Sequence, residues 1–447
     1  MSRRVAVIGF GVTGRAVARC LLARGDEVVV FDDSPSDGLV AAAGALGVTV
    51  ERTPAAVELQ RQIAGAALVV PSPGVPVSHP VYAAAEAEGV PVRSEIEIAS
   101  ELREGSNPEL VAITGTNGKT TVTTLVTAML QASGVNAVAA GNIGVPLVEA
   151  VSSGVQVCVA EVSSFQLQFT EAFRPAVSCW LNLSPDHLDW HPTIEHYAAA
   201  KARIWRNQGT GDTAVVNADD KLVMGSASTI PHGVNVVDFS LMSEAAYTYD
   251  GKVLRGPGAE EIIPSAELPR SLPHDIANAL AATAVASAAG ASVDGCRGAL
   301  RGAPLLPHRV SFVASSGGVA WYDDSKATTP ASVLAAVAGF GSVVLIAGGR
   351  NKGLDLGVLA AGVPPVRSVV AIGEAAGEVA EAFRGLVPVQ AAESMQEAVA
   401  AAAAAAKQGD AVLLSPGCAS FDWYSSYAER GDHFVSVVKS LMSKGES

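Results

Sequence analysis

Positive charge is scarce in this sequence of 447 residues. Thirty Lys and Arg residues stand against 44 Asp and Glu residues, which gives a formal net charge of −14. Such a chain repels the phosphate backbone of a nucleic acid, and no local run of basic residues offsets the repulsion. We therefore expect no nucleic-acid partner.

Cysteine is also rare, and its placement excludes two kinds of site. The five cysteines lie far apart, without a C-x-x-C pair: Cys20, Cys158, Cys179, Cys296 and Cys418. A structural zinc site or a redox-active pair needs closely spaced thiols. We expect the thiols to be reduced and mostly buried.

Uninterrupted apolar runs of membrane-spanning length are missing as well. The uncharged stretches 120–148 and 327–349 are long enough to span a bilayer, yet both contain Gly and polar residues and change their period midway. The basic pair Arg3-Arg4 precedes an apolar run that Gly9 interrupts, unlike a signal peptide. We expect no membrane insertion and a cytoplasmic location.

Three α/β units follow one another along the chain. At roughly 150 residues per domain, the length predicts about three domains. Short β-branched runs alternate with Ala-rich helical stretches, which is typical of parallel sheets covered by helices. Breaks at 106–108 and 305–307 place the domains at 1–99, 100–306 and 307–447. We expect a Rossmann-like domain, a central P-loop-type ATPase domain and a second Rossmann-like domain. Residues 229–270 predict a small β-meander inserted in the central domain.

The first motif joins a strand to a helix near the N-terminus. Gly9-Phe10-Gly11-Val12-Thr13-Gly14 follows the run 5–8, and Asp32 and Asp33 end the next strand. This arrangement matches a dinucleotide fingerprint and alone predicts NAD, hence an oxidoreductase or NAD-sensing module. The same glycines would admit any diphosphate at a helix N-terminus, including that of a UDP-sugar. A tight turn without a ligand is the third alternative.

The second motif is more specific. Gly115-Thr116-Asn117-Gly118-Lys119-Thr120-Thr121 again lies between a strand and a helix, with Ile113 at the outer glycine position of a P-loop. Backbone amides in such a loop cradle phosphate oxygens, Lys119 supplies a positive charge, and the Thr120 hydroxyl can reach Mg²⁺. A purely structural Gly-Lys-Thr turn is the alternative.

Two further acidic positions point to a metal ion. Glu161 ends the apolar strand 155–160, where it could bind Mg²⁺ or merely cap the following turn. The segment Asp186-His187-x-Asp189-x-His191 has the composition of a metal cluster, although a polar turn of this kind is often only solvated. We interpret His191 as structural.

Together these blocks resemble the Mur ligase family, the ATP-dependent enzymes that add amino acids to the peptidoglycan precursor. The resemblance covers essentially the whole chain. Beyond the nucleotide loop it includes Gly141-Asn142-Ile143-Gly144, Glu161-Val162-Ser163-Ser164-Phe165-Gln166-Leu167, Asn182-Leu183-Ser184-Pro185-Asp186-His187-Leu188-Asp189, Tyr197-Ala198-Ala199-Ala200-Lys201, His308-Arg309, Asp324-Ser325-Lys326-Ala327-Thr328 and Leu414-Ser415-Pro416-Gly417-Cys418-Ala419-Ser420-Phe421-Asp422.

The resemblance implies an ADP-forming amide ligase that works through an acyl phosphate. Its blocks are most similar to the branch that adds D-glutamate to UDP-N-acetylmuramoyl-L-alanine, so the first motif would bind a UDP-sugar rather than NAD. A pocket of lysines and hydroxyls could hold either hand of glutamate. Other Mur ligases and folylpolyglutamate synthetase are the nearest alternatives. We expect a monomer.

The resemblance also implies roles for individual residues, which divide into nucleotide, metal and catalytic groups. Those for ATP are Gly115, Thr116, Asn117, Gly118, Lys119, Thr120, Thr121, Asn278, Arg309 and Asp324. Those for two Mg²⁺ ions are Thr120, Glu161, His187 and Lys201, with Lys201 carbamylated. Lys119, Asn142, His187 and Lys201 would be catalytic. Asp275 stands where the family usually has Asn, which puts an adenine contact through Asp275 in doubt.

Substrate binding is the remaining implied role. The UDP-sugar would meet Val12, Thr13, Asp33, Ser34, Ser72 and Gly74, with Ser163 and Gln166 also assigned to substrate. The incoming glutamate would meet Lys326, Thr328, Lys352, Ser420 and Tyr427, because two cations and two hydroxyls suit a dicarboxylate that must bind with its amine free. Tyr427 stands where the family commonly has Phe.

Overall fold

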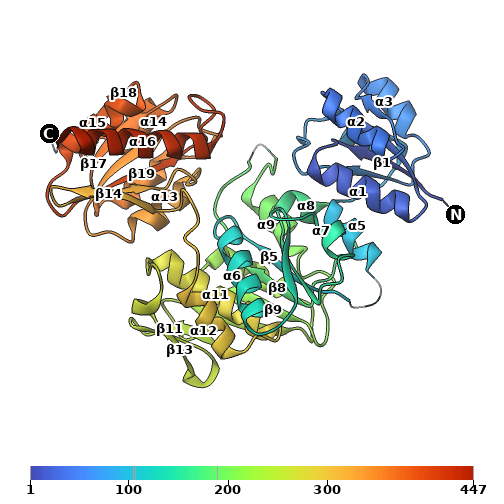
Figure 1. The fold of residues 1–447 in the computed structure, drawn as a ribbon, viewed down its shortest axis with the longest axis horizontal. Coiled ribbons are helices and arrows are strands. Elements are labelled where there is room, and N and C mark those ends of the chain that lie inside the picture. The colour runs from blue at the N-terminus through green and yellow to red at the C-terminus, as the bar shows by residue number, and fades with distance from the viewer. Residues whose placement is uncertain (1, 104, 106, 189, 446–447) are drawn as a thin grey trace. The chain divides into compact units, whose positions relative to one another are not determined.

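The computed structural model describes residues 2–103, 105, 107–188 and 190–445, so Ser106 and Asp189 of the segments above lie outside the described residues. The chain separates into two compact units, and Figure 1 labels their helices and strands. The first comprises Met1–Leu183, Glu195–Ile263 and Asn278–Leu300. The second comprises Ser184–Ile194, Pro264–Ala277 and Arg301–Ser447.

The first unit begins with a four-stranded parallel sheet, in the order β3-β2-β1-β4. Its strands are β1 (Arg4–Ile8), β2 (Glu27–Asp32), β3 (Val50–Arg52) and β4 (Leu68–Pro71). The helices α1 (Val12–Ala23), α2 (Asp37–Ala45), α3 (Ala56–Ile63) and α4 (Pro80–Glu88) alternate with them. This confirms the Rossmann-like prediction, and α5 (Glu95–Leu102) then leads to the next sheet.

The second sheet of this unit has nine strands, in the order β13-β12-β11-β10-β9-β8-β5-β7-β6. They are β5 (Glu109–Thr114), β6 (Ala137–Gly141), β7 (Val157–Glu161), β8 (Val177–Trp180), β9 (Thr213–Asn217), β10 (Asn235–Ser240), β11 (Tyr247–Tyr249), β12 (Val253–Arg255) and β13 (Glu261–Pro264). The central strands are almost wholly apolar because both of their faces are buried. The predicted β-meander at 229–270 is confirmed in part: β10 to β13 are neighbours in sequence order and β11–β12 is antiparallel, but β10 and β11 pair in parallel, and β10 joins these strands to the central sheet.

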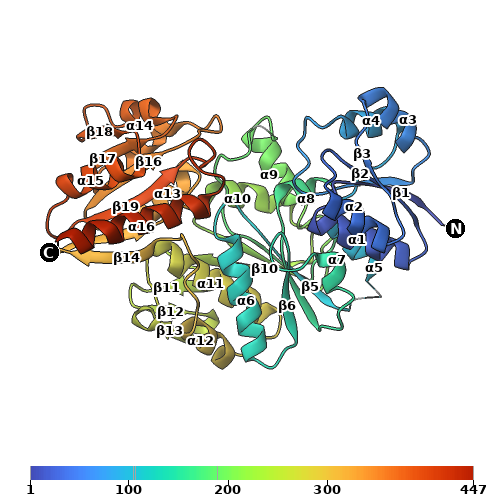
Figure 2. The ribbon, with the colours of Figure 1, turned by 45° about the horizontal axis from the view of Figure 1, so that its top comes forward.

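Helices connect these strands, as Figure 2 shows for α6 and α7. They are α6 (Lys119–Ala132), α7 (Leu147–Ala150), α8 (Ser164–Gln168), α9 (Ile194–Ala202) and α10 (Lys221–Ser226). Two more helices, α11 (Pro273–Ala288) and α12 (Val293–Arg301), follow the last strand. In the order β8-β5-β7, the strands β5 and β7 are parallel neighbours. Their carboxyl ends therefore deliver the nucleotide loop and Glu161 to the same edge of the sheet.

The second unit contains a six-stranded sheet, in the order β14-β15-β19-β16-β17-β18. Its strands are β14 (Ser311–Ser316), β15 (Val319–Asp323), β16 (Val343–Gly348), β17 (Val366–Ile372), β18 (Val389–Ala392) and β19 (Ala411–Gly417). The edge pair β14–β15 is antiparallel, and the other four pairs of neighbouring strands are parallel among the residues described. The predicted strands at 343–346, 369–372 and 411–414 are confirmed.

Helices cover both faces of this sheet. One face packs against α13 (Pro330–Val337) and α14 (Ala376–Ala382), and the other packs against α15 (Met395–Ala405) and α16 (Tyr427–Gly445). Alternate residues of β16 point into the two cores, with Val343 and Leu345 in one and Val344 and Ile346 in the other. The strand must therefore be apolar throughout.

The cysteines and the apolar stretches agree with the sequence predictions. All five cysteines are free thiols, and all but the half-buried Cys20 are buried, as predicted. Within the described ranges, no helix is both long enough and apolar enough to cross a bilayer.

Candidate active site

The carboxyl end of β5 leads into the predicted nucleotide loop, and the loop leads into α6. Gly115 and Gly118 have φ values of +156° and +84°. A β-carbon on Gly118 would lie 2.5 Å from the Asn278 side-chain oxygen. Glycine is therefore required at position 118, and Asn278 packs directly against the loop. The structure thus brings together two elements that sequence analysis assigned to the nucleotide.

Asn182, just beyond β8, fixes the shape of this loop. Its Oδ1 accepts hydrogen bonds from the backbone N–H groups of Thr116 (3.1 Å) and Asn117 (2.8 Å), and its Nδ2 donates to the Asn117 carbonyl oxygen (3.1 Å). Two loop amides are thereby used by the protein, so the first turn of α6 is the better candidate to receive phosphate. Asn182 has no predicted role, although its place at the end of a neighbouring strand is a usable signal in the sequence.

Two lysine side chains meet at this loop. Lys119 Nζ donates to the carbonyl oxygens of Gly115 (2.9 Å) and Thr116 (3.0 Å). Lys201, on α9, is 1% exposed and donates to the same Gly115 oxygen (2.9 Å), with the Thr114 hydroxyl at 3.4 Å. Its Nζ also lies 4.6 Å from the centre of the Tyr197 ring. An ordinary surface lysine is thus excluded at position 201, because the ammonium is enclosed beside the phosphate loop.

Glu161 joins the nucleotide loop to the family block at 141–144. The Thr120 hydroxyl donates to Glu161 Oε2 and the Asn142 amide donates to Oε1, both at 2.9 Å. The carboxylate is 3% exposed. Hard oxygen ligands from a carboxylate and a hydroxyl suit Mg²⁺, so these residues fit the metal that the family implies. In the part of the chain that the structure describes, no group of three His, Cys, Asp or Glu side chains forms a metal site.

The first motif lines a cavity of about 340 Å³ within the first unit. Its lining combines both predicted substrate loops with the 141–144 block: Gly11, Val12, Thr13, Ser72, Pro73, Gly74, Gly141 and Asn142. The turn is tight, because a β-carbon on Gly14 would lie 1.9 Å from the Gly9 carbonyl oxygen. The Ser72 hydroxyl donates to that same oxygen at 2.9 Å, which couples the two loops. Asn142 therefore faces this cavity and Glu161 together.

The two aspartates after β2 have different environments. Asp32 accepts from the backbone N–H groups of Phe10 (2.8 Å) and Ser34 (2.9 Å), so it holds the glycine-rich loop of the first motif in place. In a NAD-binding protein, by contrast, the carboxylate at the end of this strand binds the ribose. Asp33 remains exposed and lies 3.1 Å from His79 Nε2. Hydrogen bonds with Thr53 and His79 lower the pKa of Asp33. Asp33 is thus available to a ligand as an anion.

Ser163 and Gln166, assigned to substrate, form a local capping box at the start of α8. Ser163 Oγ accepts from the Gln166 backbone N–H (3.2 Å), and Gln166 Oε1 accepts from the Ser163 N–H (3.0 Å). Gln166 Nε2 is buried without a hydrogen-bond partner among the described residues. The capping box accounts for the motif locally, and substrate contact stays a prediction.

His187 lies in the segment Ser184–Ile194, which groups with the second unit. It has a φ of +55°, and its Nε2 lies 3.4 Å from Asp186 Oδ2. His191 is fully buried and donates its backbone N–H to the His187 carbonyl oxygen at 2.8 Å. The burial of His191 agrees with its interpretation as structural. The metal role of His187 stays a prediction.

In the second unit, the residues predicted for glutamate follow the carboxyl ends of three adjacent strands. Lys326 and Thr328 follow β15, Lys352 follows β16, and Ser420 follows β19. Arg350 and Ala419 exchange two backbone hydrogen bonds (2.9 and 3.0 Å), which ties the second of these loops to the third. Lys326 Nζ lies 4.9 Å from the centre of the Tyr427 ring, at the start of α16. The fold therefore gathers this predicted set at one sheet edge.

Two residues predicted for the nucleotide lie nearby. Asp324 accepts from the Ser415 hydroxyl (2.7 Å) and from the Val310 N–H (3.2 Å), and burial raises the pKa of Asp324 to about 7. Arg309 directly precedes Val310. Its backbone carbonyl accepts a hydrogen bond from the Arg270 guanidinium, which also donates to the Val310 carbonyl oxygen at 3.0 Å.

Asp275, the departure from the family pattern, is committed to that same arginine. Its two carboxylate oxygens accept from Arg270 Nε and Nη2 at 2.6 and 2.7 Å. It also accepts from the backbone N–H of Leu272, the residue before α11 (3.2 Å). A carboxylate at position 275 therefore pairs with the Arg270 guanidinium through both oxygens, and an amide would bind this cation more weakly.

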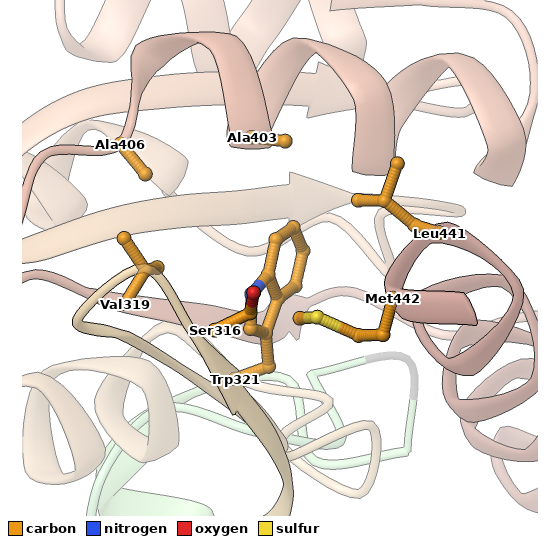
Figure 3. A pocket seen from close by; sticks show the side chains of 7 residues that line it. All are labelled: Ser316, Val319, Trp321, Ala403, Ala406, Leu441 and Met442. Carbon is orange, nitrogen blue, oxygen red and sulfur yellow. The ribbon is translucent and has the colours of Figure 1, made fainter. Parts of the chain in front are cut away.

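A second cavity, of about 280 Å³, lies in the second unit, at the end of the six-stranded sheet opposite the predicted glutamate residues. Its lining is largely apolar, and Figure 3 shows the Trp321 indole and the Met442 side chain projecting into it. Val319 starts β15 and belongs to this lining, whereas Lys326 and Thr328 follow the opposite end of that strand. The cavity is therefore separate from the predicted glutamate residues.

Comparison with protein families accounts for all three sheets. The model described as "Mur ligase MurD-like, N-terminal domain" matches residues 3–94, "Mur ligase middle domain" matches 113–286, and "Mur ligase, glutamate ligase domain" matches 308–418.

Individual relatives agree with these family models. The chain is 42% identical to "UDP-N-acetylmuramoylalanine--D-glutamate ligase" of Shouchella clausii, over 99% of this chain and 98% of that protein. It is also 42% identical to the protein of that name from Frankia casuarinae, over 97% and 93% of the two chains. A solved pseudomurein peptide ligase type C from Methanothermus fervidus shares the fold, with a TM-score of 0.62 at 16% identity, covering 98% of this chain and 100% of that one.

Proposed function

Because this chain belongs to the Mur ligase family, we propose that it joins D-glutamate to UDP-N-acetylmuramoyl-L-alanine and converts ATP to ADP and phosphate. The relatives of this name match along nearly the whole chain, which supports the assignment over other members of the family. One observation carries it: Asn142 lines the cavity of the first motif and also binds Glu161, beside the phosphate loop.

In the first step, a carboxylate oxygen of the alanyl group attacks the γ-phosphorus of ATP, and ADP leaves with the electrons of the broken P–O bond. The product is an acyl phosphate. Two anions must approach each other, so positive charge has to neutralise them. Lys119 and the N–H groups at the start of α6 would bind the phosphates, and Asn142 would donate to the transferring group. Asn278 and Asp324 would hold the nucleoside.

The family uses Mg²⁺, and Thr120 and Glu161 are the residues that fit it best here. The ion would neutralise charge that develops between the β- and γ-phosphates. The second ion of our prediction would involve His187 and Lys201.

In the second step, the glutamate amine attacks the acyl carbon, phosphate departs from the tetrahedral intermediate, and the amine nitrogen loses a proton. Lys326 and Lys352 would bind the two carboxylates of glutamate, while Thr328 and Ser420 would donate hydrogen bonds. The amine then stays unbound and reactive. These roles rest on the gathering of the four residues at the carboxyl ends of β15, β16 and β19.

Phosphate release under defined substrate combinations tests the proposal. Wild-type protein with ATP, Mg²⁺ and the UDP-linked acceptor should release phosphate continuously only when D-glutamate is present, and L-glutamate should not replace it. Lys119→Ala should be inactive in the same assay, because no other side chain of the loop carries a positive charge. Continuous turnover with another amino acid would favour another Mur ligase, whereas tight NAD binding without a response to the UDP-sugar would favour the oxidoreductase class.

A further inference from the structure

Arg430 is a buried cation in the second turn of α16. Its side chain is among the largest in the protein that are almost completely buried, at 1% exposure. The guanidinium donates to the Ser325 hydroxyl (3.0 Å), the Ser325 carbonyl oxygen (2.9 Å), the Cys418 carbonyl oxygen (3.1 Å) and the Ala419 carbonyl oxygen (3.2 Å). All of these acceptors are neutral oxygens.

These acceptors belong to two loops that carry predicted glutamate residues. Ser325 directly precedes Lys326, after β15, and Ala419 directly precedes Ser420, after β19. Through its backbone bonds with Arg350, Ala419 also fixes the loop that carries Lys352. One planar guanidinium therefore fastens the three loops on which Lys326, Lys352 and Ser420 stand.

The start of α16 reinforces the same arrangement. The Ser325 hydroxyl donates to the Tyr427 carbonyl oxygen (2.7 Å) while it accepts from Arg430. The neighbouring Gly431 has no room for a side chain, because a β-carbon there would lie 2.2 Å from His308 Nδ1. The helix is thus seated closely against the loop after β15, with Arg430 pointing between the loops.

Burying the charged Arg430 side chain among neutral acceptors costs free energy, which indicates that the residue has a function that requires a cation here. Burial lowers the pKa of Arg430 to about 10, although Asp422 and Cys418 act in the opposite direction. A buried charge normally pairs with an opposite charge, whereas the four hydrogen-bond acceptors of Arg430 named above are a hydroxyl and three backbone carbonyl oxygens. Lysine would supply a charge but lacks the fork of donors needed to bridge both loops.

We propose that Arg430 is a positioning residue for the incoming amino acid: it holds Lys326, Lys352 and Ser420 at the spacing that binds the two carboxylates of glutamate. It acts through those residues and does not touch the substrate. This inference rests on the proposed function, because it concerns the glutamate residues of the same ligase.

Steady-state kinetics of Arg430→Lys and Arg430→Ala test the inference. We expect KM for D-glutamate to rise about tenfold or more, while KM for ATP and for the UDP-linked acceptor stays within about twofold, since Asp324, although it adjoins Ser325, keeps its own hydrogen bonds with Ser415 and Val310. Guanidinium ion added to Arg430→Ala should lower KM for D-glutamate again, because it can refill the cavity that the truncation leaves. A general loss of structure would not give a selective, rescuable effect.

Arg367→Lys is the matched control. Arg367 lies near the start of β17, in the same sheet, and its guanidinium pairs with Asp410 and donates to the Ala405 carbonyl oxygen. Its loss should lower the thermal midpoint without changing KM for D-glutamate. Wild-type KM for D-glutamate in both Arg430 variants, or equal rises for all three substrates, would overturn the inference. Absence of D-glutamate-dependent turnover in the wild type would instead overturn the proposed function.

Discussion

Lys119 and Lys201 donate to one and the same acceptor, the Gly115 carbonyl oxygen, each at 2.9 Å. Two ammonium groups at one oxygen repel each other, and Lys201 is almost fully buried as well. Addition of CO₂ to the Lys201 amine, with loss of a proton, gives a carbamate, which would replace this repulsion with attraction and offer oxygen ligands to Mg²⁺.

We therefore predict that activity falls when CO₂ is stripped from the buffer and returns when bicarbonate is added. Labelled bicarbonate should give a carbamate carbon signal in the wild type that is missing from Lys201→Ala, which is a readout independent of turnover. Lys119→Ala is the control, because its inactivity should not respond to bicarbonate. Full activity of Lys201→Ala would contradict the prediction.

The carboxylate of Glu161 is predicted to be required for its charge. Glu161→Gln keeps an oxygen that can accept from Thr120 but removes the negative charge that attracts Mg²⁺. We expect kcat to fall by at least about a hundredfold and the Mg²⁺ concentration for half-maximal activity to rise. Magnesium titration of turnover measures both. Glu149→Gln, which removes a surface carboxylate paired with Arg19, should leave the magnesium curve unchanged.

Replacement of Asn278 is predicted to weaken ATP binding, whereas replacement of Asp275 is predicted to destabilise the fold. Asn278 packs on Gly118 of the nucleotide loop, so Asn278→Ala should raise KM for ATP about tenfold. Asp275 instead binds Arg270, so Asp275→Asn should destabilise the protein by about 1–3 kcal/mol while KM for ATP changes little. Nucleotide kinetics and thermal unfolding, measured on both variants, separate the two effects. A rise in KM for ATP in Asp275→Asn would assign adenine contact to that residue.

Much of this architecture could be predicted from sequence because its signals are local. Apolar runs such as β16 are buried on both faces, and glycine-rich turns such as 115–118 join a strand to a helix. The extension of the central sheet by β10 could not be predicted, since pairing between distant strands leaves no local pattern. Residues such as Asn182 and Arg430 escaped notice for the same reason: their hydrogen bonds connect loops far apart in sequence.

Lys201 shows the limit most clearly. On an Ala-rich helix its sequence context is that of a surface lysine, and only the resemblance to the family gave it a role. Its burial follows from how α9 packs beside β5, which involves residues more than eighty positions away. Tertiary packing, not local pattern, decides such a position.

Glu95, on the helix that follows the first sheet, predicts a pH dependence of stability. Its Oε1 accepts from the Val148 N–H at 2.8 Å, whereas Oε2 is buried without a hydrogen-bond partner among the described residues. Burial raises the pKa of Glu95 from 4.5 to about 7. Because the pKa of Glu95 is higher in the folded than in the unfolded protein, protonation of Glu95 favours the folded state. This contribution to stability is complete below pH 4.5 and is lost as the pH rises through 7.

Glu95→Gln should therefore raise the thermal midpoint relative to wild type more at pH 8 than at pH 5, by an amount equivalent to about 3 kcal/mol at most. Glu97 is the matched control on the same helix, since both of its oxygens accept backbone hydrogen bonds, from Ala172 (2.7 Å) and Phe173 (2.9 Å). Glu97→Gln places an N–H donor against a backbone N–H, so it should destabilise the protein at both pH values. The difference in thermal midpoint between Glu95→Gln and wild type would be the same at pH 5 and pH 8 if Glu95 did not titrate in this range. That result would contradict the prediction, because it would mean that the protein accommodates the buried carboxylate without a cost in stability.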